Sequence, residues 1–319
     1  MTIALKVIKD FSSGEEIDSF LLIKSSQVRI ASNNNKYLDL EFVDKTGTIN
    51  AKYWEYREGD EHKFVPNKML KVRGKIQDWK GSFQLKIIKS REVEESDGIN
   101  IEDFVPSAPI KNVVMYDEIL AYKNKISDEE LKQVVEIILD EYKEKLMYYP
   151  AAKSNHHSIR SGLLYHILRM LRLGENICSV YENLNIDLVF AGIILHDIEK
   201  INEMNSNELG FVDDYSCEGK LLGHIIQGVK KLEIIGERND ISREKILLLQ
   251  HMILTHHYEP EYGSPKKPMI PEAEILHYVD VMDARMYDMF EAIEDVESGE
   301  FSDRIWSLDK RQIYKTKNL

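Results

Sequence analysis

Histidines and aspartates gather in the second half of this chain. Of its ten histidines, nine follow residue 150, and most stand in apolar runs such as LLYHILRM, GIILHDIEK, LLGHII and ILTHHYE. A buried imidazole needs a polar partner, because an unpartnered polar group in a protein interior is costly. A bond to a backbone carbonyl would suffice for any single histidine. For the whole set, the pattern predicts a metal site.

The pair His196 and Asp197 ends one of these apolar runs. Adjacent helical residues point about 100° apart, so both side chains can face one point only where a helix ends. An aspartate can bridge two cations while the neighbouring imidazole binds one of them, which predicts a dinuclear centre. Mixed imidazole and carboxylate ligands favour Mn, Fe or Co. Two distant cysteines, Cys178 and Cys217, exclude a thiolate site.

The order of these residues resembles the HD superfamily of metal-dependent phosphohydrolases. Members of this superfamily gather their ligands around one or two metals in a helical fold. The resemblance implies a first histidine, a signature His-Asp pair, a closing aspartate, and extra histidines for a second metal. The metal ligands implied in this sequence are His166, His196, Asp197, His224, His256, His257 and Asp280.

Three residues near these ligands bear on catalysis. Many superfamily members read H-D-I-G-K, whereas position 199 here is Glu, which leaves metal specificity and rate open. Lys200 is expected to bind a substrate phosphate beside the catalytic Asp197; the alternative is an ordinary solvated lysine near a helix end. In the pair His156 and His157, we expect His157 to touch the scissile phosphate or protonate the leaving oxygen. The alternative is a helix contact.

The first part of the chain is typical of a β-structure. Short runs rich in β-branched and aromatic residues alternate with turn-forming residues, as at DKTG and WKGS. Five such runs fit a small closed barrel, which removes the exposed edges of a sheet. We therefore predict a five-stranded oligonucleotide/oligosaccharide-binding barrel, the OB-fold, over residues 1–93. Its strands are expected at 20–31, 36–44, 49–57, 68–79 and 82–93.

The remainder is predicted to be a linker, 94–114, then an all-helical HD domain, 115–310, and a tail, 311–319. The acidic linker contains Gly and two Pro and shows no sustained period. Ser127 is the expected N-cap of the first helix, because Glu130 follows at the capping-box spacing. The segment MYDMFEAI, residues 286–293, is expected to pack inside, with a subunit contact as the alternative. Helices are expected at 127–146, 161–181, 187–200, 218–236, 243–256 and 271–297.

Charge is uneven along the chain. The net charge of −13 argues against nucleic acid, but residues 14–92 hold 15 Lys+Arg against 12 Asp+Glu. Single strands are commonly held by aromatic stacking over a mildly basic surface. The alternative is that Trp54 and Phe83 fill the barrel core. The residues predicted to bind nucleic acid are Lys52, Tyr53, Trp54, Trp79, Lys80 and Phe83.

The combination of barrel and HD domain, with GLLYH, LLGHI and EYGSPKKPMIPEAEILH, resembles the YhaM-type 3′ to 5′ exoribonucleases, also described as cmp-binding factors. This resemblance implies an exonuclease that acts on single-stranded RNA, with single-stranded DNA as a further substrate. It implies divalent metal, usually Mn²⁺, with Fe²⁺ or Co²⁺ as alternatives and two ions expected. A nucleotide or cyclic-dinucleotide phosphodiesterase and a non-catalytic nucleic-acid-binding protein remain alternatives.

Without a signal-peptide pattern or an apolar run of about 20 residues, the sequence predicts a cytoplasmic protein with no membrane partner. Self-association stays open.

Overall fold

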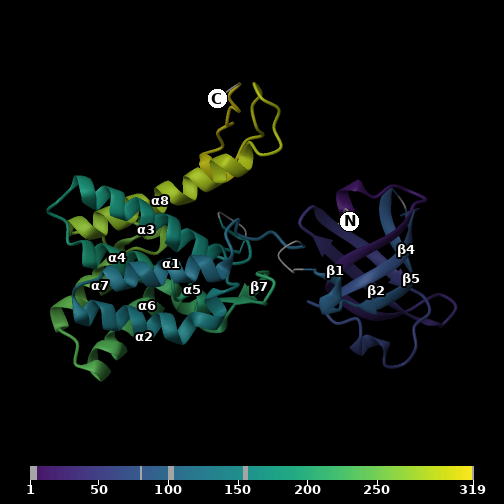
Figure 1. Cartoon of the computed structure of the whole chain (residues 1–319), viewed down its shortest axis with the longest axis horizontal. Helices are drawn as coiled ribbons and strands as arrows, with labels where there is room; N and C mark the ends of the chain where they lie inside the picture. Colours follow the sequence, from purple (N-terminus) through teal and green to yellow (C-terminus); the bar gives the residue numbers. More distant parts are fainter. Residues whose placement is uncertain (1–5, 80, 100–103, 154–156, 318–319) are drawn as a thin grey trace. The chain divides into compact units, whose positions relative to one another are not determined.

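The chain forms two compact units, Met1–Ser107 and Ala108–Leu319, whose boundary falls inside the predicted linker. The computed structural model in Figure 1 describes residues 6–79, 81–99, 104–153 and 157–317. Each unit has its own apolar core.

The first unit is a closed five-stranded barrel in the order β1-β2-β3-β5-β4. Neighbouring strands are antiparallel except for β3 and β5, which are parallel. This strand order confirms the predicted OB-type barrel. The strands are β1 (Glu16–Ile30), β2 (Lys36–Asp44), β3 (Gly47–Tyr53), β4 (Met69–Trp79) and β5 (Ser82–Glu92), with short 3₁₀ turns at Ile8–Asp10, Asp60–His62 and Glu95–Asp97.

Two irregularities allow the barrel to close. β1 is long enough to pair with β2 through its second half and with β4 through its first, and a register shift between Ile23 and Ser25 interrupts its pairing with β2. A second shift follows Arg73, where Gly74 lies against β5. A Cβ on Gly74 would come within 2.5 Å of the Lys86 carbonyl oxygen, so a larger residue would push the strands apart.

Over its described residues the second unit is mainly helical, as predicted, with one small hairpin and a C-terminal segment that folds back on itself. Its helix α4 is buried on every side from Asp187 to Leu195 and contacts α1, α2, α3, α7 and α8. The helices are α1 (Asn112–Lys125), α2 (Glu129–Leu146), α3 (Gly162–Val180), α4 (Ile186–Leu195), α5 (Lys200–Glu203), α6 (Cys217–Asn239), α7 (Arg243–Thr255) and α8 (Pro271–Ala292). The hairpin is β6 (Met204–Ser206) with β7 (Val212–Tyr215), and 3₁₀ turns lie at Pro260–Tyr262 and Trp306–Leu308.

Several boundaries differ from the sequence prediction. The N-cap of α2 is Asp128, whose carboxylate accepts the backbone N–H of Glu130 and Leu131. Ser127 instead donates its hydroxyl to Asp187 on α4, at 2.6 Å. Helix α1 was not among the predicted helices, and α4 ends at Leu195, before the His-Asp pair. Over the described ranges, none of the helices has both the length and the apolar character needed to cross a bilayer.

Candidate metal centre

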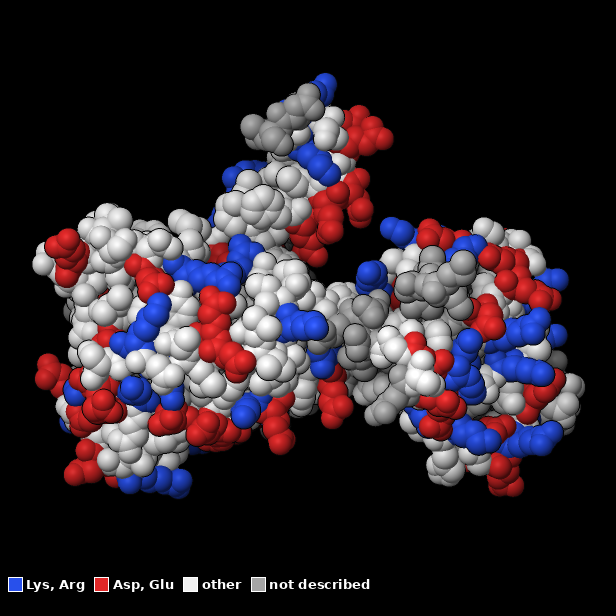
Figure 2. All heavy atoms as spheres, in the orientation of Figure 1, with Lys and Arg blue, Asp and Glu red and all other residues white. Residues whose placement is uncertain are grey.

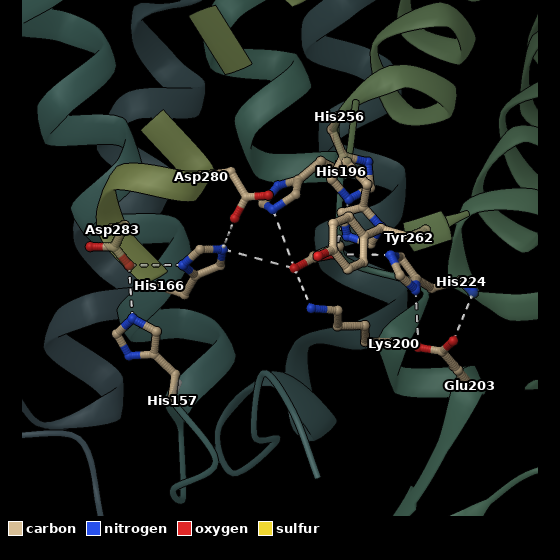
Figure 3. A network of polar contacts seen from close by, with 12 residues as sticks. His157, His166, His196, Lys200, Glu203, His224, His256, Tyr262, Asp280 and Asp283 are labelled. Carbon is tan, nitrogen blue, oxygen red and sulfur yellow. Dashed lines mark hydrogen bonds and ion pairs between the residues drawn. The ribbon is translucent and has the colours of Figure 1, made fainter. Parts of the chain in front are cut away.

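Asp197 lies where the central helix α4 stops. His196 still has helical backbone angles as the C-cap of α4, and Asp197 follows in the turn that leads to α5. Both side chains are almost completely buried. His166, His196 and Lys200, which are labelled in Figure 3, converge on one carboxylate oxygen, Oδ2 of Asp197. Their nitrogens lie 3.8, 3.3 and 2.6 Å away, respectively.

The other oxygen of Asp197, Oδ1, faces a second set of histidines. His224 Nε2 lies 3.2 Å from it and His256 Nε2 lies 3.6 Å from it. Ligand atoms of Asp197, His166 and His196 lie within 4.8 Å of one another, and so do those of Asp197, His224, His256 and His257. The two groups share only Asp197. A carboxylate placed in this way is suited to bridging two cations.

Asp280 reaches the same cluster from α8. Its Oδ1 lies 3.3 Å from His166 Nε2. The structure therefore brings all seven sequence-predicted ligands together from α3, α6, α8 and the turns that follow α4 and α7.

Helix ends orient several of these rings. His196 directly follows α4, and its Nδ1–H donates to the Ile193 carbonyl at 2.8 Å. His256 directly follows α7 and donates in the same way to Ile253 at 2.7 Å. Carbonyls in the last turn of a helix lack intrahelical donors, so they are available to these rings. Each bond fixes the tautomer and leaves the Nε2 lone pair facing Asp197.

His224 is placed by a break in α6. Gly223 has φ 70° and ψ 164°, a conformation that is essentially restricted to glycine, and it separates His224 from the preceding turn. Glu203 then holds the histidine twice. It accepts the His224 Nδ1–H at 3.0 Å and the His224 backbone N–H at 3.3 Å (Figure 3). Glu203 was not predicted, and no spacing in the sequence links it to His224.

His166 is held by Asp283, which was also not predicted. His166 Nδ1 and His157 Nε2 both donate to Asp283 Oδ2 at 2.8 Å, and Arg169 Nε forms an ion pair with Oδ1 at 2.6 Å. Asp283 is completely buried. It follows Asp280 by three residues and so lies on the same side of α8. That spacing was the one sequence feature that could have identified it.

The donor set fits a divalent cation. Buried Nε2 atoms of His196, His224 and His256, and Oδ1 of Asp197, have no hydrogen-bond partner among the described residues. So many unpaired polar atoms in one interior are costly unless an ion binds them. Nitrogen and oxygen donors without thiolates suit first-row divalent metals. The cluster is therefore a candidate divalent-metal site.

The electrostatics of the site also favour bound positive charge. Burial opposes ionisation of Asp197, but the charges of Lys200 and His196 hold the pKa of its carboxyl well below the usual range. Burial likewise opposes protonation of His166, yet Asp280 and Asp283 raise its pKa to about 9. Buried carboxylates thus attract cations here, and a divalent metal can take the place of protons.

Lys200 is not an ordinary solvated lysine. Its side chain is mostly buried, and its ammonium lies 2.6 Å from Asp197 Oδ2. Burial disfavours the charged form, but the Asp197 carboxylate raises the pKa of Lys200 above its ordinary value. A permanent positive charge therefore stands beside the cluster.

Glu199 does not enter the cluster. Its backbone angles, φ −75° and ψ −2°, are open to any residue, so this turn does not require the glycine found in many HD proteins. Its carboxylate accepts the Tyr142 hydroxyl and the Asn202 amide, each at 2.7 Å. Glu199, the residue that departs from the motif, thus links α5 to α2 through these two hydrogen bonds.

The position of His157 differs from the expected substrate contact. Its ring is 0% exposed, and its Nε2 is engaged by Asp283 behind His166. A fully enclosed side chain cannot touch a bound phosphate without rearrangement. His156, the other histidine of that pair, lies outside the described residues.

On the barrel, three predicted aromatic side chains lie outside the core. Trp54 stacks on Tyr37 with ring centroids 4.5 Å apart and is 48% exposed, so it does not fill the barrel. Trp79 and Phe83, near the turn between β4 and β5, are also exposed. Phe83 borders a groove of about 400 Å³ that also includes Arg29 and Asn50.

Two of the remaining residues predicted to bind nucleic acid are already engaged in contacts within the barrel. Tyr53 packs against Phe64, and Lys52 pairs with Asp39 while its ammonium lies 5.5 Å from the Tyr37 ring centroid. Lys80 lies outside the described residues. Lys and Arg are mixed with Asp and Glu on the visible face of the barrel (Figure 2). Among its described residues, this face shows no concentrated basic stripe. The exposed aromatic side chains are therefore better suited than the basic residues to hold a nucleic-acid strand.

Comparisons with known proteins decide the family. A family model described as "HD domain" matches residues 163–285, a range that contains all seven clustered residues. The 3′-5′ exoribonuclease YhaM of Geobacillus sp. (strain WCH70) is 42% identical over 97% of this chain and 95% of its own length. YhaM of Bacillus subtilis (strain 168) is 41% identical over 95% of each chain. This chain belongs to the YhaM family of 3′-5′ exoribonucleases.

A more distant relative in the YhaM family, from Listeria monocytogenes serotype 4b (strain F2365), is 38% identical over 97% of this chain and 98% of its own. Among solved structures, the second OB-fold domain of replication protein A from Methanococcus maripaludis covers 28% of this chain and 94% of its own, with 13% identity and a TM-score of 0.23. A replication protein A heterotrimer bound to ssDNA covers 30% of this chain and 70% of its own, with 16% identity and a TM-score of 0.22. At such scores, the barrel assignment depends on its own strand order.

Proposed function

We propose that this chain is a divalent-metal-dependent 3′-5′ exoribonuclease that hydrolyses single-stranded RNA, and that it also accepts single-stranded DNA. The observation that carries the proposal is Asp197, whose two oxygens face two separate groups of histidines. Membership of the YhaM family supports both the hydrolysis of RNA and its 3′ to 5′ direction.

The seven clustered residues are proposed as the metal ligands. His166, His196 and Asp280 would hold one ion, His224, His256 and His257 would hold another, and Asp197 would be shared. Mn²⁺ is the expected metal, with Fe²⁺ and Co²⁺ as alternatives that the same donors accept. When bound, such ions polarise a phosphodiester and lower the pKa of a bound water.

The chain's own residues prepare this site in two ways. Backbone carbonyls, Glu203 and Asp283 fix the imidazoles so that little reorganisation is needed when charge develops. Lys200, held by Asp197, adds a positive charge that can stabilise a phosphate oxygen. His157 is proposed to position His166 through Asp283, in place of the substrate contact expected from sequence.

The barrel is proposed to hold the strand. Exposed Trp54, Trp79 and Phe83 provide flat surfaces on which bases can stack without regard to sequence. The Lys52 ammonium lies over the ring of Tyr37, on which Trp54 stacks, and adds a positive charge that Asp39 partly offsets. This arrangement would raise the local concentration of RNA 3′ ends.

An RNA degradation ladder with matched variants tests the proposal. End-labelled single-stranded RNA with Mn²⁺ should give mononucleotide steps from the 3′ end. Asp197→Asn should abolish these steps, whereas Asp187→Asn, which alters a buried aspartate at the other end of α4, should keep them if the fold survives. An intact strand would favour a non-catalytic binder. Rapid cleavage of small nucleotides with no RNA trimming would favour a nucleotide phosphodiesterase.

A further inference from the structure

The C-terminal end of the chain forms an arm, here defined as residues 285–317. In Figure 1 the end of α8 and the residues after it project beyond the other helices of this unit. Helix α8, described along its whole length, buries Leu276, Val279 and Asp283 but no side chain beyond Asp283. Past that residue α8 contributes no completely buried side chain, although Tyr287 still packs on His157.

The arm is an ordered structure with a small core of its own. Backbone bonds join Gly299 to Lys315 at 2.7 Å and Ser302 to Ile313 at 2.8 Å, and Leu308 is completely buried. Arg285 pairs with Asp309 at 2.7 Å, which ties the folded-back segment to α8. A unit this small gains little from its own core, so a partner would be needed to bury the rest of its apolar surface.

An exposed apolar ridge runs along α8 into the arm. Tyr278, Met282, Met286 and Phe290 follow one another at intervals of four residues, and all are exposed. The expectation that residues 286–293 pack inside was therefore wrong for Met286 and Phe290. Side chains at this spacing form the ridge that packs into grooves of another helix in the commonest class of helix contact.

Aromatic side chains extend the ridge over the folded-back segment. Trp306 is 82% exposed, and Phe301 and Tyr314 are exposed although they contact each other. A stable dimer buries roughly 800 Å² per partner, and a fully covered aromatic side chain contributes about 150–250 Å². With Phe290, these aromatics supply a large share of the required area.

Charges on the arm are divided between its two parts. The end of α8 is acidic, and burial together with the like charges of Asp288 and Glu294 raises the pKa of Glu291. Figure 2 shows acidic side chains along one side of the arm. The folded-back segment, residues 299–317, carries five basic residues against three acidic ones, and the basic ones are Arg304, Lys310, Arg311, Lys315 and Lys317.

We propose that a second copy of this chain docks on the arm. The ridge of one α8 packs against the ridge of the other, and the acidic helix end of each copy faces the basic segment of its partner. A two-fold axis satisfies both charge contacts at once, because the same surface serves both copies. This complementarity within one arm favours a second copy over an unrelated partner.

Sedimentation of the full chain tests this proposal. At about 1–100 μM, concentrations where standard interfaces are populated, the wild type should sediment as a dimer or larger assembly. Phe290→Glu and Trp306→Glu should each reduce its size. Val113→Glu, a matched change at an exposed apolar residue of α1, should leave it unchanged. A monomeric wild type would overturn the proposal. So would arm variants that sediment like the wild type, even if those variants bind RNA more weakly.

A charge exchange guards against variants that simply misfold. Glu291→Lys and Lys310→Glu should each weaken self-association, because like charges would then meet across the two-fold axis. Mixing the two variants should restore assembly, since both contacts then pair opposite charges. If the mixture sediments no faster than the separate variants, the proposed arrangement of the arm is wrong.

Discussion

His166 donates its Nδ1 hydrogen to Asp283, which lies 2.8 Å away and is completely buried. This bond couples α3 to α8 and turns the other ring nitrogen of His166 toward Asp197 and Asp280. Arg169 and His157 hold the same carboxylate from two other directions. Asp283 therefore sets the orientation of a proposed metal ligand without reaching the cluster itself.

Replacing Asp283 should weaken metal binding. Asp283→Asn keeps an acceptor for His166 but removes the charge that aligns the ring and pairs with Arg169. Loss of such an orienting group typically lowers metal affinity by about 10–100-fold. Calorimetric titration of metal-stripped protein with Mn²⁺ measures this directly. Glu274→Gln, at a half-buried position in the first turn of the same helix, is the control, and equal affinities for both variants would contradict the role given to Asp283.

The sequence predicted the proposed ligands more completely than the groups that orient them. His196 and His256 stand at the ends of apolar runs, and a residue at a helix end can turn toward a shared point. Glu203 and Asp283 escaped prediction because any of many carboxylates could meet an Nδ1. The kink at Gly223 brings His224 to Glu203, and the packing of α3 against α8 brings His166 to Asp283. Neither feature can be read from the sequence.

Local signals competed at other positions. Ser127 and Asp128 are both good N-cap residues, and Asp187 on α4 decides between them by taking the Ser127 hydroxyl. The ridge at Met286 and Phe290 has the helical spacing of a core face. Its exposure follows from the length of α8, which extends beyond the other helices (Figure 1).

Glu199→Gly should lower stability and leave the metal site intact. The backbone at this position has ordinary helical-turn angles, so glycine relieves no strain, while the Tyr142 and Asn202 bonds are lost. We expect a loss of about 1–3 kcal/mol, because a hydrogen bond to a buried charged group contributes at that level. Denaturant unfolding gives the loss, and metal analysis gives the ion content. Reduced metal content with unchanged stability would show that Glu199 acts on the cluster.

Acid should destabilise the helical unit partly through His157. Burial lowers the pKa of His157 to about 4, although Asp283 opposes this shift. The unfolded chain, with a histidine pKa near 6.5, binds more protons between these values, so the free energy of unfolding falls as the pH drops from about 6.5 to 4. The contribution is on the order of 3 kcal/mol.

His157→Gln removes this titration while its amide can still donate to Asp283. In metal-stripped protein, its unfolding free energy should therefore fall less steeply over that pH range than the wild-type value. Denaturant unfolding at several pH values provides the comparison. His62→Gln, an exposed change on the barrel, should reproduce the wild-type slope. Equal slopes for all three proteins would show that His157 binds its proton at the same pH in the folded and the unfolded chain.

RNA binding should depend on the exposed barrel aromatics. Trp54 and Phe83 lie on the outer surface of the barrel, and Trp54 is already braced by stacking on Tyr37. Each stacked base contributes about 1–3 kcal/mol by alanine substitution, so Trp54→Ala should weaken single-strand binding by about 5–150-fold. Fluorescence anisotropy with labelled RNA at fixed ionic strength measures the affinity.

The same substitution should leave hydrolysis of a small phosphodiester unchanged, because that substrate needs only the cluster around Asp197. Val65→Ala, at another exposed apolar position of the barrel, controls for general effects on its surface. If Trp54→Ala, Phe83→Ala and Val65→Ala all bind RNA as the wild type does, the strand must be held elsewhere. A loss of activity on the small substrate would instead show that these aromatics support the hydrolytic site.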